Sequence, residues 1–489
     1  MAAKITRVSA LDVIVAWDEA DRRHVYLEGA DLVFAGNEFV HVGPNYTGPA
    51  DLTIDGRGLM AIPGFVNVHS HPFSEPANKG VTEEFGSDKL GQSSLYEYLP
   101  VFGLDPEAAG PSTLVAISEL LKSGVTTVTD LSIARPGWLD DLAASGIRAV
   151  VAPMMRQAHW YTKNGHTVDY AWDEKAGEKA FAEAMHTIDL ALQHPSGRLS
   201  GMVCPSQIDT CGEGFFREAL AEARRRKVPM QTHAAQAIVE FNEIVRRHGK
   251  TPIEWLDAIG VLGPDLIVGH GIFLNDHPQI HWPHGDDFAR LKASGAAVAH
   301  CPTVFARRGI ALNTMGRYID AGIPLGIGTD TFPHNMIDEM RLACYAARIL
   351  SGNYKSGTTR HAFEAATVGG ARLLRRPDLG KLESGCKADF SLVDLAHPYM
   401  QPAHEPVRSL IYSASERAIR DVYVDGVQVV RKGKVLTVDV EAATAGLVEG
   451  QRKRMATVPM RDWAGRAADQ LAPPVYAKRD RLPQSRPVT

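Results

Sequence analysis

Histidines and one aspartate follow directly on apolar runs of the sequence. One run leads into His69-Ser70-His71, and three later runs end at His233, His270 and Asp330. Residues two apart on a strand point to the same face, so His69 and His71 can direct both imidazoles toward one point. An isolated His-x-His triplet is often coincidental, but a barrel core alone gives no reason for such side chains to recur. The pattern therefore predicts a metal site.

The residue types at these run ends indicate which metal and which chemistry to expect. Neutral imidazole and carboxylate suit Zn²⁺ or Fe²⁺. Such an ion lowers the pKa of bound water from 15.7 to roughly 7, which makes hydroxide available at neutral pH. Asp330 can accept a proton from that water. His270 can orient the hydroxide or stabilise developing charge without binding the metal.

Eight near-continuous apolar runs alternate with amphipathic helical stretches, and these elements must position the candidate ligands. Continuous apolar runs are typical of parallel strands buried on both faces. Eight strand–helix repeats predict an α/β fold with a closed (β/α)₈ barrel, whose active site lies at the carboxyl ends of the strands. The runs are residues 61–68, 125–128, 148–152, 201–204, 228–232, 266–269, 296–299 and 323–328, and predicted helices include 111–121, 178–192, 216–226 and 286–293.

Short strands separated by turns flank this pattern on both sides, and Asp425-Gly426 is a favourable hairpin turn. The N-terminal piece is too small to bury a good core alone, so we expect it to pair with the C-terminal strands. We predict one small β-sandwich built from residues 1–61 and 385–440, the barrel at 62–384, and a C-terminal helix and tail at 441–489. The long segment 72–110 is predicted to be an active-site loop.

Composition narrows the class of protein. The 489 residues are 45% hydrophobic and 22% charged, with a net charge of −5, which excludes wholesale disorder and argues against nucleic-acid binding. Five scattered cysteines without a CxxC pair argue against disulfides and thiolate zinc sites. The sequence lacks a signal peptide and any run of about 20 apolar residues. We expect a cytoplasmic protein that binds a small molecule, not a membrane or nucleic acid.

At these motifs the sequence resembles the amidohydrolase superfamily, in the branch that holds cytosine deaminase, guanine deaminase, atrazine chlorohydrolase and related triazine hydrolases. The segments that carry the resemblance are residues 63–71, 232–236, 269–271, 298–302, 328–330 and the Gly-x-Leu-x-x-Gly-x-x-Ala-Asp signature within 380–390. The resemblance spans almost the whole chain, including the split sandwich. It implies a homodimer or larger homo-oligomer, for which the helix around residues 446–456 and the tail look suited.

The resemblance also implies the site residues. It assigns His69, His71, His233 and Asp330 as ligands of one divalent metal, Zn²⁺ or Fe²⁺, and His270 as a catalytic residue beside them. Two-metal members add a carboxylated lysine at the end of strand four. Residues 204–211 contain no lysine, which favours one metal.

Position 236 departs from the family pattern. Deaminases of this branch have a glutamate three residues after the strand-five histidine, and here that residue is Gln236. Gln236 can hydrogen-bond a substrate, but it cannot act as a general acid or base near neutral pH. A solvated helix position is expected for Glu240, with a role as a substitute at the pocket as the alternative. The departure favours substrates that need less ring protonation, such as a urea, carbamate, amide or activated heterocycle.

Further candidates for substrate contact lie on predicted loops. They are Gln207 after strand four, Arg156, His159 and Trp160 after strand three, and His334 after Asp330. Methionine and aromatic residues in the third loop suit a flat apolar ligand, although a packing role fits each of them equally well. For His334 the alternative is a loop histidine that caps a helix.

The leading hypothesis is a metal-dependent hydrolase that cleaves a non-peptide carbon–nitrogen bond of a small N-heterocyclic or urea-like compound. Metal-bound hydroxide attacks the carbon, and Asp330, His270 and Gln236 take the catalytic roles. A hydrolytic dehalogenase or a carbamate or amide hydrolase is the alternative within the superfamily. A catalytically inactive binding protein and a Lewis-acid isomerase or lyase are alternatives of other classes.

Overall fold

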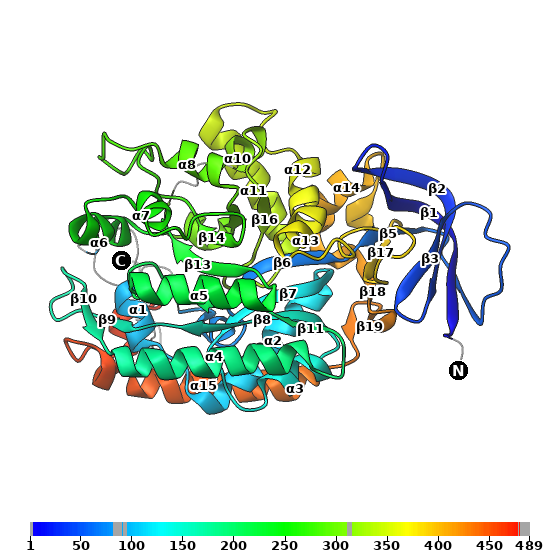
Figure 1. The fold of residues 1–489 in the computed structure, drawn as a ribbon. Coiled ribbons are helices and arrows are strands. Elements are labelled where there is room, and N and C mark those ends of the chain that lie inside the picture. Colours follow the sequence, from blue (N-terminus) through cyan, green and yellow to red (C-terminus); the bar gives the residue numbers. More distant parts are fainter. Residues whose placement is uncertain (1–2, 82–89, 91–94, 311–314, 478, 480–489) are drawn as a thin grey trace, which may run out of the picture.

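Parallel strands close into a barrel in the computed structural model, which describes residues 3–81, 90, 95–310, 315–477 and 479 (Figure 1). In that portion of the chain, eight strand positions lie in two sheets, ordered β11-β8-β7-β6 and β13-β14-β15-β16. Bridges from Val203 to Met230 and from Ser70 to Asp330 join the two sheets at both seams. The strands are β6 (Phe65–Ser70), β7 (Val125–Ser132), β8 (Arg148–Met155), β11 (Leu199–Gly201) continued by β12 (Cys204–Pro205), β13 (Met230–Ala234), β14 (Leu266–His270), β15 (Ala297–His300) and β16 (Leu325–Ile327).

Burial explains why these strands read as continuous apolar runs. Every residue of β7, β13 and β14 is buried, because helices cover the outer face and side chains fill the interior. The predicted fold class is confirmed. The fourth run is the exception in detail: β11 and β12 are short pieces, interrupted at Met202 and Val203.

Helices surround the barrel at the predicted positions, and several begin a few residues earlier than predicted. Helix α4 starts at Glu174 because the Asp173 side chain accepts a hydrogen bond from the Ala176 amide at 2.9 Å. In the described chain, no helix combines the length and apolar character needed to cross a bilayer. The helices are α1 (Leu95–Val101), α2 (Pro106–Lys122), α3 (Trp138–Ala144), α4 (Glu174–Leu192), α5 (Glu213–Arg226), α6 (Ile238–His248), α7 (Pro252–Ala258), α8 (Asp287–Ser294), α9 (Pro302–Ala306), α10 (Met315–Asp320), α11 (Met336–Ser351), α12 (Thr359–Glu364), α13 (Gly370–Leu373), α14 (Pro406–Ser409), α15 (Val440–Arg461) and α16 (Ala468–Leu471).

The N- and C-terminal strands form one sheet at the end of the barrel (Figure 1). Its described strands follow the order β20-β19-β18-β17-β5-β1-β2-β3, and β5 pairs antiparallel with β17 to unite the two chain ends. The sheet curls back on itself: the Phe39 amide donates to the Cys386 carbonyl at 2.9 Å, which encloses a core around Phe34, Phe39 and Phe390. The strands are β1 (Ile5–Asp18), β2 (Arg23–Ala35), β3 (Glu38–Gly43), β4 (Leu52–Asp55), β5 (Leu59–Pro63), β17 (Phe390–Asp394), β18 (Ile419–Val424), β19 (Val427–Arg431) and β20 (Lys434–Val435).

Arg148, the first residue of β8, ties the barrel to this sheet. Its guanidinium donates to both carboxylate oxygens of Asp389, at 2.8 and 3.0 Å, and to Asp425 at 2.8 Å. The Arg148 and Asp389 side chains are almost fully buried. Two carboxylates around one guanidinium satisfy a buried cation that would otherwise be costly.

The C-terminal helix α15 lies along α2 of the same chain (Figure 1). Its buried face includes Leu447 and Val458, and a Cβ at Gly450 would lie 2.3 Å from the Ala108 Cβ, so glycine permits the close approach. The inner face of the helix is therefore used within the chain. Residues 480–489 of the predicted tail lie outside the described residues.

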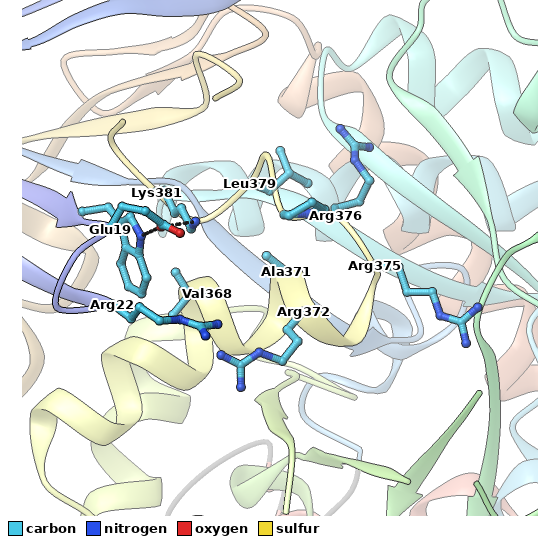
Figure 2. Close-up of a pocket in the computed structure, with 11 residues that line it drawn as sticks. Glu19, Arg22, Val368, Ala371, Arg372, Arg375, Arg376, Leu379 and Lys381 are labelled. Atoms are coloured by element: carbon cyan, nitrogen blue, oxygen red, sulfur yellow. Dashed lines mark hydrogen bonds and ion pairs between the residues drawn. The ribbon is translucent and has the colours of Figure 1, made fainter. Parts of the chain in front are cut away.

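A cavity of about 260 Å³ separates the β1–β2 turn from α13 (Figure 2). Cations line it, and several are paired: Lys381 with Glu19, Arg376 with Asp378 and Arg375 with Asp265. Asp265 directly precedes β14, so this cavity lies at the amino ends of the barrel strands. It is thus remote from the carboxyl ends, where a barrel places its active site.

Candidate metal centre and active-site cavity

The five residues predicted from the run ends meet at the carboxyl end of the barrel. His71 Nε2 lies 3.3 Å from Asp330 Oδ1, and His69 Nε2 lies 3.5 Å from the same oxygen. His71 Nε2 and His233 Nε2 are 3.2 Å apart. His270 Nε2 lies 3.8 Å from Asp330 Oδ2. All five side chains are thus brought together.

Backbone hydrogen bonds fix Asp330 against the first strand. The Asp330 amide donates to the His69 carbonyl at 2.8 Å, and the His71 amide donates to the Asp330 carbonyl at 2.9 Å. Asp330 has φ 55°, in the left-handed region that non-glycine residues seldom adopt. Buried Asn67 adds a clamp, because its amide group donates to Thr329 Oγ1 at 2.8 Å and accepts the Thr329 amide. The strain at Asp330 is therefore held by surrounding bonds, as is common at functional sites.

The outer ring nitrogens of two histidines are fixed by main-chain carbonyls. His71 Nδ1 donates to the Leu131 carbonyl at 2.8 Å, and His233 Nδ1 donates to the Ser206 carbonyl at 2.6 Å. Each ring therefore carries its proton on Nδ1 and directs an Nε2 lone pair inward. Two inward nitrogens 3.2 Å apart suit a shared cation.

The third histidine is oriented by a side chain that the sequence reasoning missed. His69 Nδ1 donates to Gln231 Oε1, and the Gln231 amide group donates to the Val68 carbonyl at 3.1 Å, which fixes its orientation. His69 Nε2 is buried and has no hydrogen-bond partner among the described residues. A signal was present: Gln231 lies two residues before His233 and so shares its strand face.

The donor set fits a divalent metal ion. Donor atoms about 2.1 Å from one ion lie roughly 3 to 3.5 Å apart, which is close to the His69–Asp330, His71–Asp330 and His71–His233 separations of 3.5, 3.3 and 3.2 Å. Ligand atoms of His69, His71 and Asp330 lie within 4.8 Å of one another, and so do those of His69, His233 and His270. Burial and the neighbouring imidazoles lower the pKa of His233 well below its usual value, so its ring is neutral, as a ligand must be.

Gln231 provides a test of this arrangement that does not involve a ligand. Gln231→Leu removes the acceptor for His69 Nδ1 while keeping a similar volume. We expect metal affinity to fall about 10- to 100-fold, because the His69 ring loses its orientation. Competition with a chelator measures the affinity. Gln231→Glu keeps an acceptor for His69 Nδ1 but loses the donor to the Val68 carbonyl, so it should lose less affinity than Gln231→Leu; equal losses in both variants would contradict the orienting role.

A cavity of about 390 Å³ opens over this cluster. His71, His233, His270 and Asp330 line it, together with Gln207 and Gln236. Predicted loop residues also line it, namely Arg156 and His159 after β8 and Glu75 in the 3₁₀-helix η1 (Glu75–Asn78). The segment 72–110 contributes further lining residues and contains η1, α1 and the start of α2, so it borders the cavity as predicted but is partly helical; residues 82–89 and 91–94 lie outside the described residues.

Gln236 and Glu240 lie in different environments. The Gln236 amide group donates to Gln207 Oε1, so both amides sit on the cavity wall. Glu240 is fully buried, and the expected solvated helix position is wrong. Its Oε1 accepts the Ala235 amide at 2.6 Å, so it braces the turn behind Gln236 and does not line the cavity. Burial, with the nearby Asp209 carboxylate, raises the Glu240 pKa well above its usual value.

Two other candidates lie behind the cavity wall. Trp160 belongs to the hairpin of β9 (Ala158–Tyr161) and β10 (Asp169–Trp172), and its Nε1 donates to Asp209 Oδ2 at 3.0 Å. His334 is buried beside Glu119, with Nδ1 3.7 Å from Glu119 Oε2. Neither residue lines the cavity, so the structure argues against direct substrate contact by either side chain.

Comparisons with known proteins identify the family of this chain. The Amidohydrolase family matches residues 60–429. The chain is 28% identical over 444 residues to a 5-methylthioadenosine/S-adenosylhomocysteine deaminase of Pelotomaculum thermopropionicum, covering 89% of this chain and 95% of the relative. It is 25% identical over 419 residues to a 5′-deoxyadenosine deaminase of Methanosarcina acetivorans, covering 85% and 91%.

Solved structures share the fold. An adenosine deaminase from Xanthomonas campestris with bound zinc has a TM-score of 0.78 and 22% identity, covering 93% of this chain and 99% of the other. Atrazine chlorohydrolase from Arthrobacter aurescens complexed with zinc has a TM-score of 0.76 and 23% identity, covering 91% and 100%. The chain therefore belongs to the amidohydrolase family and is a hydrolase that acts on carbon–nitrogen bonds other than peptide bonds.

Proposed function

We propose that this chain is a cytoplasmic enzyme that binds one divalent metal ion, Zn²⁺ or Fe²⁺, and hydrolyses a carbon–nitrogen bond of a small N-heterocyclic or urea-like compound. The observation that carries the proposal is the clustering of His69, His71, His233 and Asp330, whose facing donor atoms lie 3.2 to 3.5 Å apart beneath a cavity of about 390 Å³. A cavity of that size suits a small molecule. The zinc present in structures with the same fold supports the choice of metal.

In this proposal the side chains at the cavity divide the work. A metal held by the three histidines and Asp330 would lower the pKa of water and polarise the substrate carbon. Asp330 accepts a proton from the attacking water and passes it to the nitrogen as the carbon–nitrogen bond breaks. His270, with Nε2 3.8 Å from Asp330 Oδ2, stabilises charge on the substrate oxygen or nitrogen. Gln236 and Gln207 hydrogen-bond the substrate.

The amide at position 236 shapes the expected substrate. A glutamine can donate or accept a hydrogen bond, but it cannot protonate a ring nitrogen. A urea, carbamate, amide or activated heterocycle with a good leaving group therefore suits the site better than an aminopurine. The likeness to atrazine chlorohydrolase keeps displacement of a halide as a second candidate.

A substrate screen tests the function. Metal-loaded protein is assayed against deaminase, urea, carbamate and chlorotriazine substrates, with metal-stripped protein as the control. Turnover of at least one class that depends on metal supports the proposal. Product that lacks solvent oxygen in ¹⁸O-water would instead indicate a lyase or isomerase. Metal binding without any turnover would indicate a binding protein on this fold.

We also propose a homodimer or a larger homo-oligomer. Helix α15 uses one face on α2, and its outer face carries Val448 and Met460, which are 60% and 78% exposed. Burying such side chains between subunits is favourable. Light scattering at micromolar concentration should give at least twice the mass of one chain. A monomer under these conditions would contradict the proposal.

A further inference from the structure

The cavity of about 260 Å³ at the amino ends of the barrel strands collects positive charge (Figure 2). It lies between α13, with the loop that follows it, and the turn that joins β1 to β2. Of its eleven described lining residues, five are cations and one, Glu19, is an acid. The cations are Arg22, Arg372, Arg375, Arg376 and Lys381. Like charges around one hollow repel each other, so this arrangement is favourable when anions lie close by.

Carboxylates supply that opposite charge for three of the five cations, and these carboxylates are all engaged. The pairs are Arg376 with Asp378, Arg375 with Asp265, and Lys381 with Glu19 and Glu383. Asp265 is shared, because it also binds Arg224 at 2.7 Å. Glu19 is held by Trp17, whose Nε1 donates to its Oε2 at 2.6 Å. The hydrogen bond from Trp17 and the charge of Lys381 lower the Glu19 pKa, so its negative charge is already used there.

Arg22 and Arg372 differ from the other three cations. Among the described residues, no carboxylate lies within 4.0 Å of either guanidinium group. The undescribed loop after Val81 has described neighbours, Val81 and Leu90, that pack against α15 and the β9–β10 hairpin near the opposite end of the barrel. Figure 2 shows the Arg22 and Arg372 side chains extending toward one another. Two guanidinium groups that face one hollow from different elements can both donate to an anion between them.

Arg22 also has a backbone conformation that arginine seldom adopts. Its φ is 51°, in the left-handed region that glycine or asparagine occupies more readily in a turn. Arg375, which lines the same cavity, has φ 58°. Outliers of this kind are a reason to ask what the side chain does. Glycine would fit this turn with less strain, so the turn itself does not account for an arginine at position 22.

The remaining lining residues indicate what the anion is attached to. Val368, Ala371 and Leu379 present apolar side chains to the cavity, and the Trp17 indole is a further wall. Lys381 Nζ lies 4.8 Å from the centre of the Trp17 ring, which places positive charge beside this wall. The hollow is larger than one phosphate or carboxylate group, so an organic part attached to the anion would contact the apolar surface.

We propose that this cavity binds the phosphate group of a small molecule, and that Arg22 and Arg372 hold it. A phosphate suits two guanidinium forks better than a carboxylate does, because it offers three acceptor oxygens and a charge of about −1.5 to −2 at pH 7. The paired cations around it add to the positive potential of the cavity. The site is separate from the substrate cavity and uses none of the residues on which the proposed function depends.

Calorimetry on the metal-loaded protein tests the site with two probes, inorganic phosphate and phenyl phosphate. Arg22→Gly and Arg372→Met should each weaken binding about tenfold or more, because each removes a charge-assisted contact. Phosphate held at the metal centre persists in both variants, so only the binding that they lose is assigned to this cavity. Within that component, tighter binding of phenyl phosphate identifies a phosphate ester as the ligand, whereas equal binding identifies the free ion.

A matched control separates the site from general charge. Arg217→Met deletes an arginine that is 58% exposed on α5, changes net charge equally, and should leave phosphate binding intact. A loss in this control as large as in Arg22→Gly would overturn the proposal. So would binding that is unchanged in both cavity variants, or the absence of binding of either probe to wild type at about 10 mM.

Thermal unfolding supplies a readout that a structural role would not reproduce. Phosphate should raise the unfolding midpoint of wild type and have a smaller effect on Arg22→Gly and Arg372→Met. Without phosphate, Arg22→Gly should unfold at the same temperature as wild type or higher, because glycine accepts the positive φ. A lower midpoint together with unchanged phosphate affinity would assign Arg22 to the turn and overturn the proposal. Arg372→Glu should abolish phosphate binding, because it places a carboxylate opposite Arg22.

Discussion

Asp330→Asn should reduce turnover by several orders of magnitude. Asp330 Oδ1 lies 3.3 Å from His71 Nε2 and 3.5 Å from His69 Nε2, so the carboxylate belongs to the metal-binding cluster. Its other oxygen faces His270 and the cavity. An asparagine oxygen still ligates weakly, but it cannot accept a proton from water. The substitution thus removes a ligand charge and the proposed base together.

The comparison that gives this result its meaning is Gln236→Ala. Gln236 donates a hydrogen bond to Gln207 and lines the cavity, so its loss should cost a hydrogen bond's worth of roughly 1.5–3 kcal/mol, or about 10- to 100-fold in turnover. Both variants are assayed at matched metal occupancy, since otherwise lost metal mimics lost chemistry. If Gln236→Ala is as inactive as Asp330→Asn, the proton route through Asp330 is wrong. If its removal changes little, Gln236 only packs.

Gln236→Glu extends the same test. The glutamate that deaminases of this branch carry at this position would be restored beside Gln207. We expect weak new activity on amino-heterocycles, since a carboxyl group at the cavity wall can protonate a ring nitrogen. Assays with cytosine and adenosine measure it. The Glu240 carboxyl group does not take this role in wild type, because it is fully buried and does not line the cavity.

The strands and the metal-binding cluster could be predicted because both follow from local patterns. Apolar runs reveal strands buried on both faces, and in a parallel barrel every carboxyl end lies at the same rim. His69, His233 and Asp330 each stand at such an end, so their meeting follows from topology alone. The length of α4 was less predictable, since its start depends on the Asp173 cap.

The positions of side chains beyond the strand ends were harder to predict from the sequence. Their orientation in loops and helices depends on contacts with other parts of the chain. A solvated helix position is expected for Glu240, yet its hydrogen bond from the Ala235 amide holds it inside. Trp160 and His334 follow catalytic strand ends, yet Asp209 and Glu119 hold them behind the cavity wall. Partners of this kind lie 5 to 215 residues away along the chain, and no periodic pattern in the sequence predicts them.

The same limit applies to the groups that orient the ligands. Leu131 and Ser206 orient the histidines through their main-chain carbonyls, so their side-chain types do not indicate this role. Gln231 differs, because its side chain is the acceptor and it shares a strand face with His233. A sequence can therefore reveal an orienting residue when it is polar and lies two residues from a ligand on a buried strand.

His69→Ala and His71→Ala should each remove the metal and abolish activity while the fold survives. Purified wild type is expected to hold about one Zn²⁺ or Fe²⁺ per chain, measured by elemental mass spectrometry. Each substitution deletes one of the Nε2 atoms that face Asp330 Oδ1. With one donor gone, the remaining residues hold the ion more weakly, so metal occupancy and turnover should fall together.

Survival of the fold follows from where stability resides. Most barrel strands are buried from end to end and pack against the surrounding helices, so loss of one imidazole at the rim leaves that apolar core intact. Circular dichroism and thermal unfolding of each variant should therefore resemble those of metal-stripped wild type. His159→Ala is the matched control, because His159 lines the same cavity without facing the cluster and should keep its metal. A fully active preparation of either ligand variant without bound metal would show that the chemistry does not depend on this centre.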